Sequence, residues 1–525
     1  CTCIPLLVKG RGRSVSIMPL FLFLMSVTSL IFANPFHLSD AVQNDGRGLN
    51  ALLLNPWMVV HPPILFAGYA CALPLYASAF SALSKKTWGA TAPYVRVYAY
   101  LCASLILGGL FTGGFWAYET LGWGGFWGWD PVENGALVPF LLSVALILRT
   151  DSGIESLRTD RAGMFLASSV FISVMLSAFM TRSGILSDSS VHSFSNSALG
   201  IPFAMISMCA LFIPAGAVWY GRKYDGVVSF PSNACEKIFS GITSFIVIYT
   251  VMIFAITVLP VVAGIVIGTS YSLRENMFND LSLPAAAVLL SAIGVSRIIS
   301  VTRASSLMLI AGASVSVAVA LSVMVISGGG PWIAALAVCA AAAFASSVIH
   351  LVKKGKSVTS GFMFYAGFSL FVLGVIASSQ GPSARIELRR ASPVTWRGMT
   401  FEYVGMTTKN DRAFVIKMKE SGSEHVGIIP IVRTTDGGST AGAPLIFRGF
   451  LKDHYISAEG YISADDMEHI AGLKEKKSEV GKDALRWETL VLNVSLKPMM
   501  ILVWFGVIMT AAGLVWALVS GRRFQ

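Results

Sequence analysis

Charged residues are scarce in this chain of 525 residues: only 13% are Asp, Glu, Lys or Arg, whereas 54% are hydrophobic. An ordinary soluble domain carries about 25% charged residues, so a soluble multidomain enzyme is excluded. The charges that do occur are concentrated between positions 381 and 497. This distribution predicts a membrane protein that carries one hydrophilic domain.

Cysteine is scarce as well, and the seven cysteines include no CxxC pair. Most of them lie in apolar stretches, so the sequence indicates neither a disulfide framework nor a thiolate metal site. The net charge of +11 does not point to nucleic acid. Most Lys and Arg outside 381–497 fall in short loops on one side of the predicted membrane spans, which is a signal of orientation.

Apolar segments long enough to cross a bilayer recur along the chain. A span needs about 20 apolar residues, and we therefore expect about 12 transmembrane helices. The segments lie near 17–34, 57–83, 97–118, 131–148, 163–181, 200–220, 238–268, 281–299, 306–326, 331–350, 360–380 and 498–520.

Alternating these spans places nearly all the basic residues of the short loops on one side, while the other side holds only Arg47, Arg182 and Arg274. Because short cytoplasmic loops are rich in Lys and Arg, both ends of this chain are expected to be cytoplasmic. The segments expected outside are the loop Pro35–Pro56, the Trp-rich loop Glu119–Asp130, the loop Arg182–Leu199 and the region 381–497.

The region 381–497 has the pattern of a small β domain. Its candidate strands alternate or are rich in β-branched residues, and Gly, Asp and Asn separate them, which favours a β-sandwich or barrel. These strands are Ala384–Arg389, Thr400–Val404, Ala413–Lys417 and His425–Val432. The predicted fold is an all-α polytopic membrane protein with a small external β-rich domain inserted before the last helix.

The run from Trp116 to Asn134 is the most specific feature of the chain, because it contains four Trp, one Phe and four Gly before an Asp-Pro-Val-Glu-Asn end. An interfacial aromatic belt is one explanation, but a belt spreads its aromatic residues over many helix ends. Trp and Phe rings provide stacking area, and glycines let the backbone approach a flat ligand closely. A porphyrin is a ligand of this kind.

Haem iron needs axial ligands, and imidazole is the usual one. Two histidines are expected at membrane boundaries on the side of the Trp-rich loop. His61, followed by two prolines, opens the second span, and His192 lies in the next outside loop. Each alone is explained as an ordinary loop or helix-cap histidine, but together they are candidates for the two faces of one iron.

The run Trp116–Asn134 resembles the tryptophan-rich "WWD" signature of the haem-handling proteins of cytochrome c biogenesis. Within that group the chain resembles the CcmF family, the large subunit of the cytochrome c haem lyase. The segments that carry this second resemblance are Asp45–Asn50, His61–Pro63, Thr181–Gly184 and the region 381–497.

The resemblance implies a protein that accepts haem from a covalent, CcmE-type haem chaperone on the outer face of the bacterial inner membrane, or of the mitochondrial inner membrane if the protein is organellar. With CcmH/CcmI-type subunits it would join the haem vinyl groups to the two cysteine thiols of an apocytochrome c CxxCH motif. It would act by positioning, with no catalytic side chain of its own.

On the same resemblance, His61 and His192 match the two external haem ligands. The haem-binding shelf would consist of Trp116, Trp123, Trp127, Trp129 and Asp130. Two cations on an otherwise charge-poor face are candidates for propionate partners, namely Arg47 and Arg182.

The family also carries an internal haem b between two histidines in different spans. The matching positions here hold Leu148 and Tyr365. Neither replaces an imidazole pair, which puts the internal haem in doubt. Family members have about three further amino-terminal spans, so the amino-terminal end of this chain is expected to be incomplete.

Two other functions remain open. Twelve spans with both ends inside is also a transporter layout, although no two halves of the chain look alike. A haem export or binding module without ligation activity is the third possibility.

The predicted organisation is a transmembrane haem-handling domain at 1–380 with its Trp-rich loop at 116–134, an external (periplasmic) β-rich domain at 381–497, and a final helix with a cytoplasmic tail at 498–525. Apart from haem and protein partners, only membrane lipid is expected to contact the chain.

Overall fold

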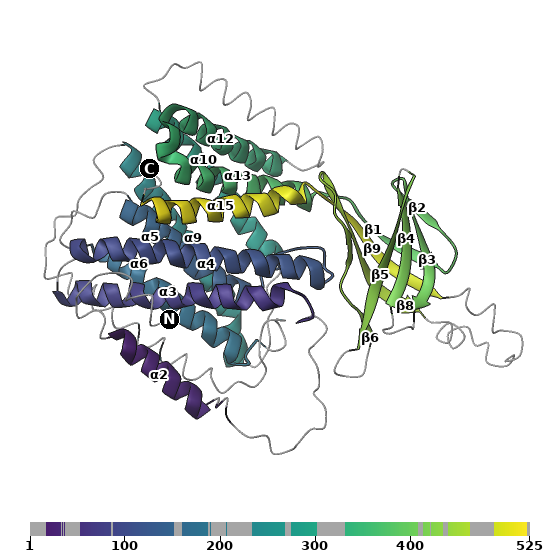
Figure 1. Ribbon diagram of the computed structural model, residues 1–525, viewed down its shortest axis with the longest axis horizontal. Coiled ribbons are helices and arrows are strands. Elements are labelled where there is room, and N and C mark those ends of the chain that lie inside the picture. Colours follow the sequence, from purple (N-terminus) through teal and green to yellow (C-terminus); the bar gives the residue numbers. More distant parts are fainter. Residues whose placement is uncertain are drawn as a thin grey trace, which may run out of the picture.

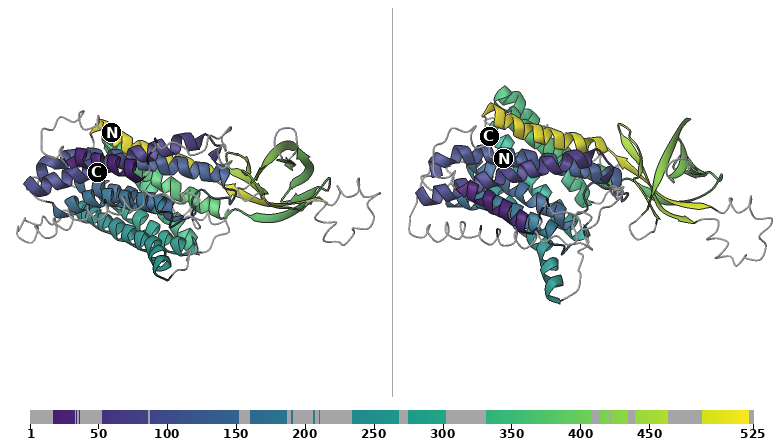
Figure 2. Two further views of the ribbon diagram at one scale, coloured as in Figure 1. Left: turned by 90° about the horizontal axis from the view of Figure 1, so that it is seen from below. Right: turned by 60° about the horizontal axis from the view of Figure 1, so that its bottom comes forward.

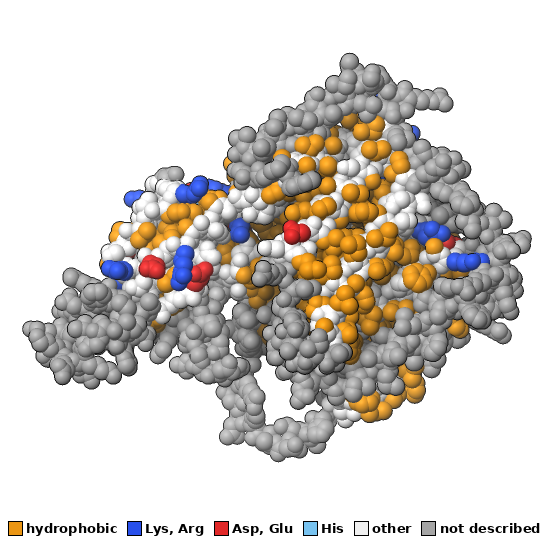
Figure 3. Space-filling view, turned by 180° about the vertical axis from the view of Figure 1, so that it is seen from behind, with side chains coloured by type: hydrophobic (Ala, Val, Ile, Leu, Met, Phe, Trp, Pro, Cys, Tyr) orange, Lys and Arg blue, Asp and Glu red, His pale blue; other side chains and the backbone are white. Residues whose placement is uncertain are grey.

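In this computed structural model, a bundle of helices and a smaller β domain are joined end to end (Figure 1). The structure describes residues 17–32, 34, 36, 53–85, 88–151, 160–186, 190, 206, 210, 234–267, 275–301, 331–407, 413–420, 422–433, 439–462 and 488–521. Seen from behind, hydrophobic side chains cover the exposed helical face, and most of the visible charged side chains lie over the β domain (Figure 3).

The described helices are long and mostly apolar. They are α2 (Ile17–Phe32), α3 (Trp57–Lys85), α4 (Trp88–Thr120), α5 (Pro131–Asp151), α6 (Arg161–Arg182), α9 (Ala234–Ile267), α10 (Glu275–Val301), α12 (Pro331–Lys354), the 3-10 helix η4 (Gly355–Val358), α13 (Thr359–Ser379) and α15 (Met500–Ser520).

Nine of these described helices are long and apolar enough to cross a membrane, and they coincide with nine of the expected spans. Helix α2 coincides with the first expected span but has only 16 residues, which is shorter than a typical span. The expected spans near 200–220 and 306–326 fall largely outside the described residues. The number of twelve therefore stays a prediction.

The β domain is a sandwich of two antiparallel sheets, as expected. One sheet has the order β1-β9-β8-β7 and the other the order β2-β3-β4-β5-β6. Inward side chains from both sheets, such as Leu388, Phe401 and Leu492, form its buried core. The strands are β1 (Ser383–Arg389), β2 (Val394–Trp396), β3 (Met399–Thr407), β4 (Ala413–Glu420), β5 (Ser423–Arg433), β6 (Ser439–Ala441), β7 (Leu445–Phe447), β8 (Lys452–Ile462) and β9 (Thr489–Pro498).

The domain sits at the end of the bundle because the helices that enter and leave it pack against each other. Helix α13 leads into β1 and strand β9 leads into α15, and β1 pairs with β9. Glycines allow the two helices to touch through their backbones: a Cβ on Gly506 would meet the backbone nitrogen of Phe371, and one on Gly374 would lie 2.5 Å from that of Val503. Both further views show the domain projecting from this end (Figure 2).

We expect Gly506→Ala to destabilise the protein. Alanine is normally favoured over glycine within a helix by about 1 kcal/mol, but here the added methyl group overlaps backbone, and overpacking costs about 1–3 kcal/mol. The measurement is thermal unfolding of the purified protein in detergent. Gly241→Ala, in α9 where a Cβ would meet nothing within 4 Å, is the matched control and should not lower the melting temperature. Equal melting temperatures for both variants would contradict the close packing of α13 and α15.

Candidate functional site

The Trp-rich loop is fixed by hydrogen bonds to the start of α5. Asp130 accepts a hydrogen bond from the backbone N–H of Val132 at 2.7 Å, which caps the helix, and another from the Ser190 hydroxyl at 2.8 Å. Glu133 accepts hydrogen bonds from the backbone N–H groups of Gly128 at 3.0 Å and Asp130 at 3.2 Å. These contacts give the loop one conformation at the end of the bundle.

Two further contacts tie the loop to α9 and α10. Asn134, fully buried, donates its amide hydrogens to the Trp129 carbonyl and the Thr257 hydroxyl, both at 3.1 Å. The Trp129 indole N–H donates to Asn279 at 2.8 Å, and the ring stacks on Phe278 with centroids 5.3 Å apart. The loop is therefore held from three helices.

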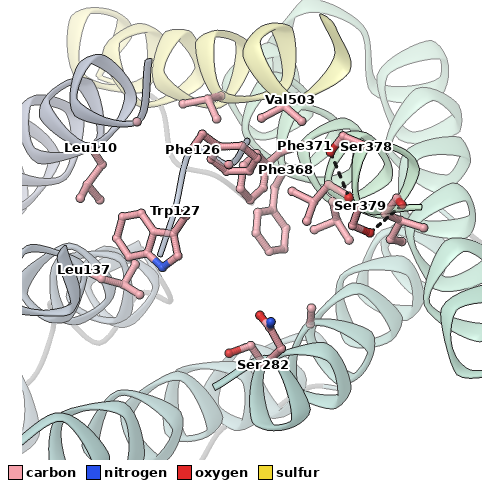
Figure 4. A pocket seen from close by; sticks show the side chains of 18 of the residues that line it. Leu110, Phe126, Trp127, Leu137, Ser282, Phe368, Phe371, Ser378, Ser379 and Val503 are labelled. Carbon is pink, nitrogen blue, oxygen red and sulfur yellow. Dashed lines mark hydrogen bonds between the residues drawn. The ribbon is translucent and has the colours of Figure 1, made fainter. Parts of the chain in front are cut away.

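An apolar cavity of about 490 Å³ lies beside this loop, a size typical of small-molecule sites. Trp127 and Trp129 line it, with nearly perpendicular rings 5.9 Å apart. Helices α4, α5, α10, α13 and α15 provide most of the wall, and Trp127 reaches into the open space between them (Figure 4). The cavity can hold the apolar body of a ligand against aromatic rings.

His61 lies in the first turns of α3 and packs against α4. Its Nδ1 is 2.8 Å from the Gly109 carbonyl oxygen. A carbonyl only accepts, so Nδ1 carries the proton and Nε2 is the nitrogen with the lone pair. A Cβ on Gly113 would lie 2.8 Å from the imidazole Cε1, so only glycine leaves room for the ring. This arrangement orients the imidazole as metal sites require.

His61 and the cavity lie on different faces of α4. Gly109 and Gly113, one turn apart, contact His61, whereas Leu110 and Gly114 line the cavity. The Trp-rich loop touches the same stretch, because the Phe126 carbonyl oxygen would lie 3.1 Å from a Cβ on Gly114. The helix therefore separates the imidazole from the cavity while keeping both next to the loop.

The structure brings only some of the predicted site residues together. Trp127, Trp129 and Asp130 share the loop, and Ser190, two positions before His192, contacts Asp130. Trp123 is 43% exposed, whereas Trp116 is buried within α4. Arg182 is the last residue of α6 and is partly buried. His192 and Arg47 lie outside the described residues.

The β domain docks on the loop and on the end of α4. The Tyr118 hydroxyl donates to the buried Asp453 carboxylate at 3.1 Å, and burial raises the pKa of this carboxyl. Tyr118 and Tyr455 pack together, with ring centroids 5.2 Å apart. At the edge, Arg448 forms an ion pair with Glu119 at 2.5 Å.

A hydrogen-bonded path continues from this edge to the helix of His61. Glu119 also accepts a hydrogen bond from the Asn55 side-chain amide at 3.1 Å. The Asn55 side-chain oxygen Oδ1 accepts a hydrogen bond from the backbone N–H of Trp57 at 2.9 Å, which caps α3. The β domain thus helps to fix the start of the helix that positions His61.

The positions matched to the internal haem b do not fit such a group. Leu148 and Tyr365 are both buried, and neither offers an imidazole. The Arg297 guanidinium lies 4.3 Å from the Tyr365 ring centroid and 3.3 Å from Nδ1 of His350. A cation held on the tyrosine ring lies where the family has a histidine, so these residues do not fit an internal haem b.

Sequence reasoning missed several residues around the cavity, including Phe126, Lys497 and Trp504. Phe126 belongs to the Trp-rich run but was not singled out. Lys497 and Trp504 come more than 360 positions after the loop, and no local pattern indicates that the end of β9 returns to it. Only the pairing of α13 with α15 brings them there.

Comparisons with known proteins agree with the resemblance seen in the sequence. Residues 1–186 match the model of a family described as Cytochrome C assembly protein. The cytochrome c-type biogenesis protein CcmF of Pseudomonas fluorescens is 32% identical over 282 residues, which are 51% of this chain and 40% of that protein. The cytochrome c-type biogenesis protein CycK of Bradyrhizobium diazoefficiens is 26% identical over 94% of this chain and 76% of its own length.

A solved structure titled Cytochrome c Heme Lyase CcmF has the same fold, with a TM-score of 0.69 and 16% sequence identity over 98% of this chain and 80% of that chain. The chain spans less than half of the P. fluorescens protein. Together the comparisons confirm the resemblance to CcmF-type cytochrome c biogenesis proteins. With the apolar helices, they support an integral membrane protein.

We expect Tyr118→Phe to weaken the docking of the β domain. The change removes the hydroxyl donor and leaves a buried carboxylate without that partner, which costs about 1–3 kcal/mol. Thermal unfolding and limited proteolysis of the purified protein measure the effect. Tyr98→Phe, a buried tyrosine of the same helix for which no hydroxyl hydrogen bond is seen among the described residues, is the control. If the two variants lose equal stability, the bond to Asp453 does not hold the domain.

Proposed function

We propose that this chain handles haem in cytochrome c maturation as a subunit of a cytochrome c haem lyase. It would hold substrate haem at the loop end of the bundle for covalent attachment to the cysteines of an apocytochrome c CxxCH motif. The observation that carries the proposal is His61, whose Nδ1–H is fixed on the Gly109 carbonyl beside a rigid Trp-rich loop. An oriented imidazole of this kind can serve as a haem ligand.

Different residues around the loop would hold different parts of the haem. His61 would bind iron through Nε2 from one face, and His192 from the other. The exposed Trp123 ring would stack on the porphyrin, while Trp116, Trp127, Trp129 and Asp130 keep the shelf in shape. Arg182 and Arg47 would pair with propionates.

The bond-forming step needs no nucleophile from this chain. Each substrate thiol adds across a haem vinyl group: a carbon–sulfur bond forms, the thiol proton ends on the other vinyl carbon, and no net oxidation occurs. The protein's contribution would be to hold the vinyl groups and the two thiols in a reactive geometry.

The proposed setting is the bacterial inner membrane, or the mitochondrial inner membrane for an organellar protein, with the Trp-rich loop and the β domain on the outer face. The proposed division is a transmembrane haem-handling domain at 1–380, an external domain at 381–497 and a final helix with its tail at 498–525. A CcmE-type chaperone would deliver haem, and CcmH/CcmI-type subunits would bring the apocytochrome.

We expect His61→Gly to lower haem affinity by about tenfold or more, since even losing a residue that only orients a metal ligand costs about 10–100-fold. The measurements are the Soret band of the purified full chain and covalent haem on a co-expressed cytochrome c. Added imidazole should fill the vacated space and restore the band.

His425→Ala, an exposed histidine of the β domain, is the control and should leave both readings unchanged. An unaltered Soret band in His61→Gly without imidazole would overturn the assignment of His61. A colourless wild-type protein with an intact fold, and normal covalent cytochrome c in its absence, would overturn the proposed function.

A further inference from the structure

Lys497 stands at the end of β9, just before α15 begins. It is the one charged side chain among the described residues that line the cavity. The loop glycine Gly124 explains how it comes so close: with a φ of +80°, it takes a left-handed turn, and a Cβ there would lie 3.4 Å from the Lys497 amine. The amine therefore lies against the backbone of the Trp-rich loop.

This lysine has no carboxylate within ion-pair distance in the described part of the chain. Its cross-strand neighbour is Asp453, but that carboxylate accepts hydrogen bonds from the Tyr118 hydroxyl and the Gly449 backbone N–H. Burial lowers the pKa of Lys497. A half-buried ammonium of this kind is costly unless a partner offsets its loss of hydration.

The cavity that Lys497 lines has mainly apolar and aromatic walls. Phe126, Trp127 and Trp129 come from the loop, and Phe371 and Trp504 come from α13 and α15. Phe126 and Trp504 rings are 5.7 Å apart. Such a wall suits a large apolar molecule, and Lys497, the one cation in the described lining, suits one negative group on it.

We propose that this cavity is a second binding site for an apolar molecule that carries a carboxylate, and that Lys497 pairs with the carboxylate. Two molecules have this chemistry: substrate haem, through a propionate, and a membrane fatty acid. The haem alternative rests on the proposed function, whereas the pairing with a carboxylate does not.

The second site is distinct from the iron site. Helix α4 lies between the cavity and His61, so a porphyrin in the cavity is not ligated by His61. Lys497 would be a positioning residue that holds a carboxylate near the loop, and it would act before or apart from iron ligation. A result that contradicts one of the two sites therefore does not contradict the other.

The experiment uses iron-free protoporphyrin IX, so that no histidine ligation contributes. Binding to the purified full chain in nanodiscs is followed by quenching of tryptophan fluorescence. Wild type and Lys497→Met are each titrated with protoporphyrin IX and with its dimethyl ester, which lacks free carboxylates. The same comparison of two proteins and two ligands is made with palmitate and methyl palmitate. Their binding is measured by competition with a fluorescent fatty acid.

For the wild type we expect the free acid to bind about 10–100-fold more tightly than the ester, as a charge-assisted hydrogen bond allows. In Lys497→Met this preference should disappear, and Lys497→Arg should keep most of it. A preference confined to protoporphyrin identifies haem as the ligand, and one confined to palmitate identifies a membrane fatty acid. If the acid-over-ester ratio is the same in wild type and Lys497→Met for both ligands, the proposal is overturned.

Two controls separate this result from loss of fold and from the iron site. Lys419→Met removes an exposed lysine of the same domain and should keep the wild-type ratio. His61→Gly should also keep it, because His61 faces away from the cavity. If His61→Gly abolishes the preference and Lys497→Met does not, the carboxylate lies in the iron site and the second site does not exist.

Discussion

The backbone-to-backbone packing of α13 and α15 controls the geometry of the whole loop end. Because glycines let these helices touch, the chain leaves the bundle and returns to it at nearly the same point. Strands β1 and β9 then start and end side by side, and the sandwich between them sits over the Trp-rich loop. Tyr118 and Asp453, more than 300 positions apart, meet as a result.

The apolar spans, the β-sandwich and the Trp-rich run could be predicted because each is a local signal. Length and hydropathy identify a span, alternation identifies strands such as β1 and β3, and the density of Trp and Gly distinguishes the loop from scattered aromatics. The role of each residue within the loop was harder to predict from the sequence. Glu133 and Asn134 form hydrogen bonds with the backbone of the loop itself. The sequence is equally compatible with hydrogen bonds from these side chains to a ligand.

Long-range placement could not be predicted, because it depends on which helix face each residue occupies. His61 and Trp127 belong to the same predicted site. The 3.6-residue period of α4 nevertheless turns Gly113 toward His61 and Gly114 toward the cavity that Trp127 lines. One residue of offset along a helix is a rotation of about 100°. The cavity was missed for the same reason, since its wall combines helices from widely separated parts of the chain.

Trp129 has a backbone φ of 55°, a left-handed conformation that a residue with a side chain adopts at a cost of about 1–3 kcal/mol. The indole contacts with Phe278 and Asn279 oppose that cost, so the bent backbone and α10 hold each other in place. A small rotation of α10 that broke these contacts would let the tryptophan relax toward ordinary angles. The position of α10 and the backbone conformation of the loop are therefore coupled.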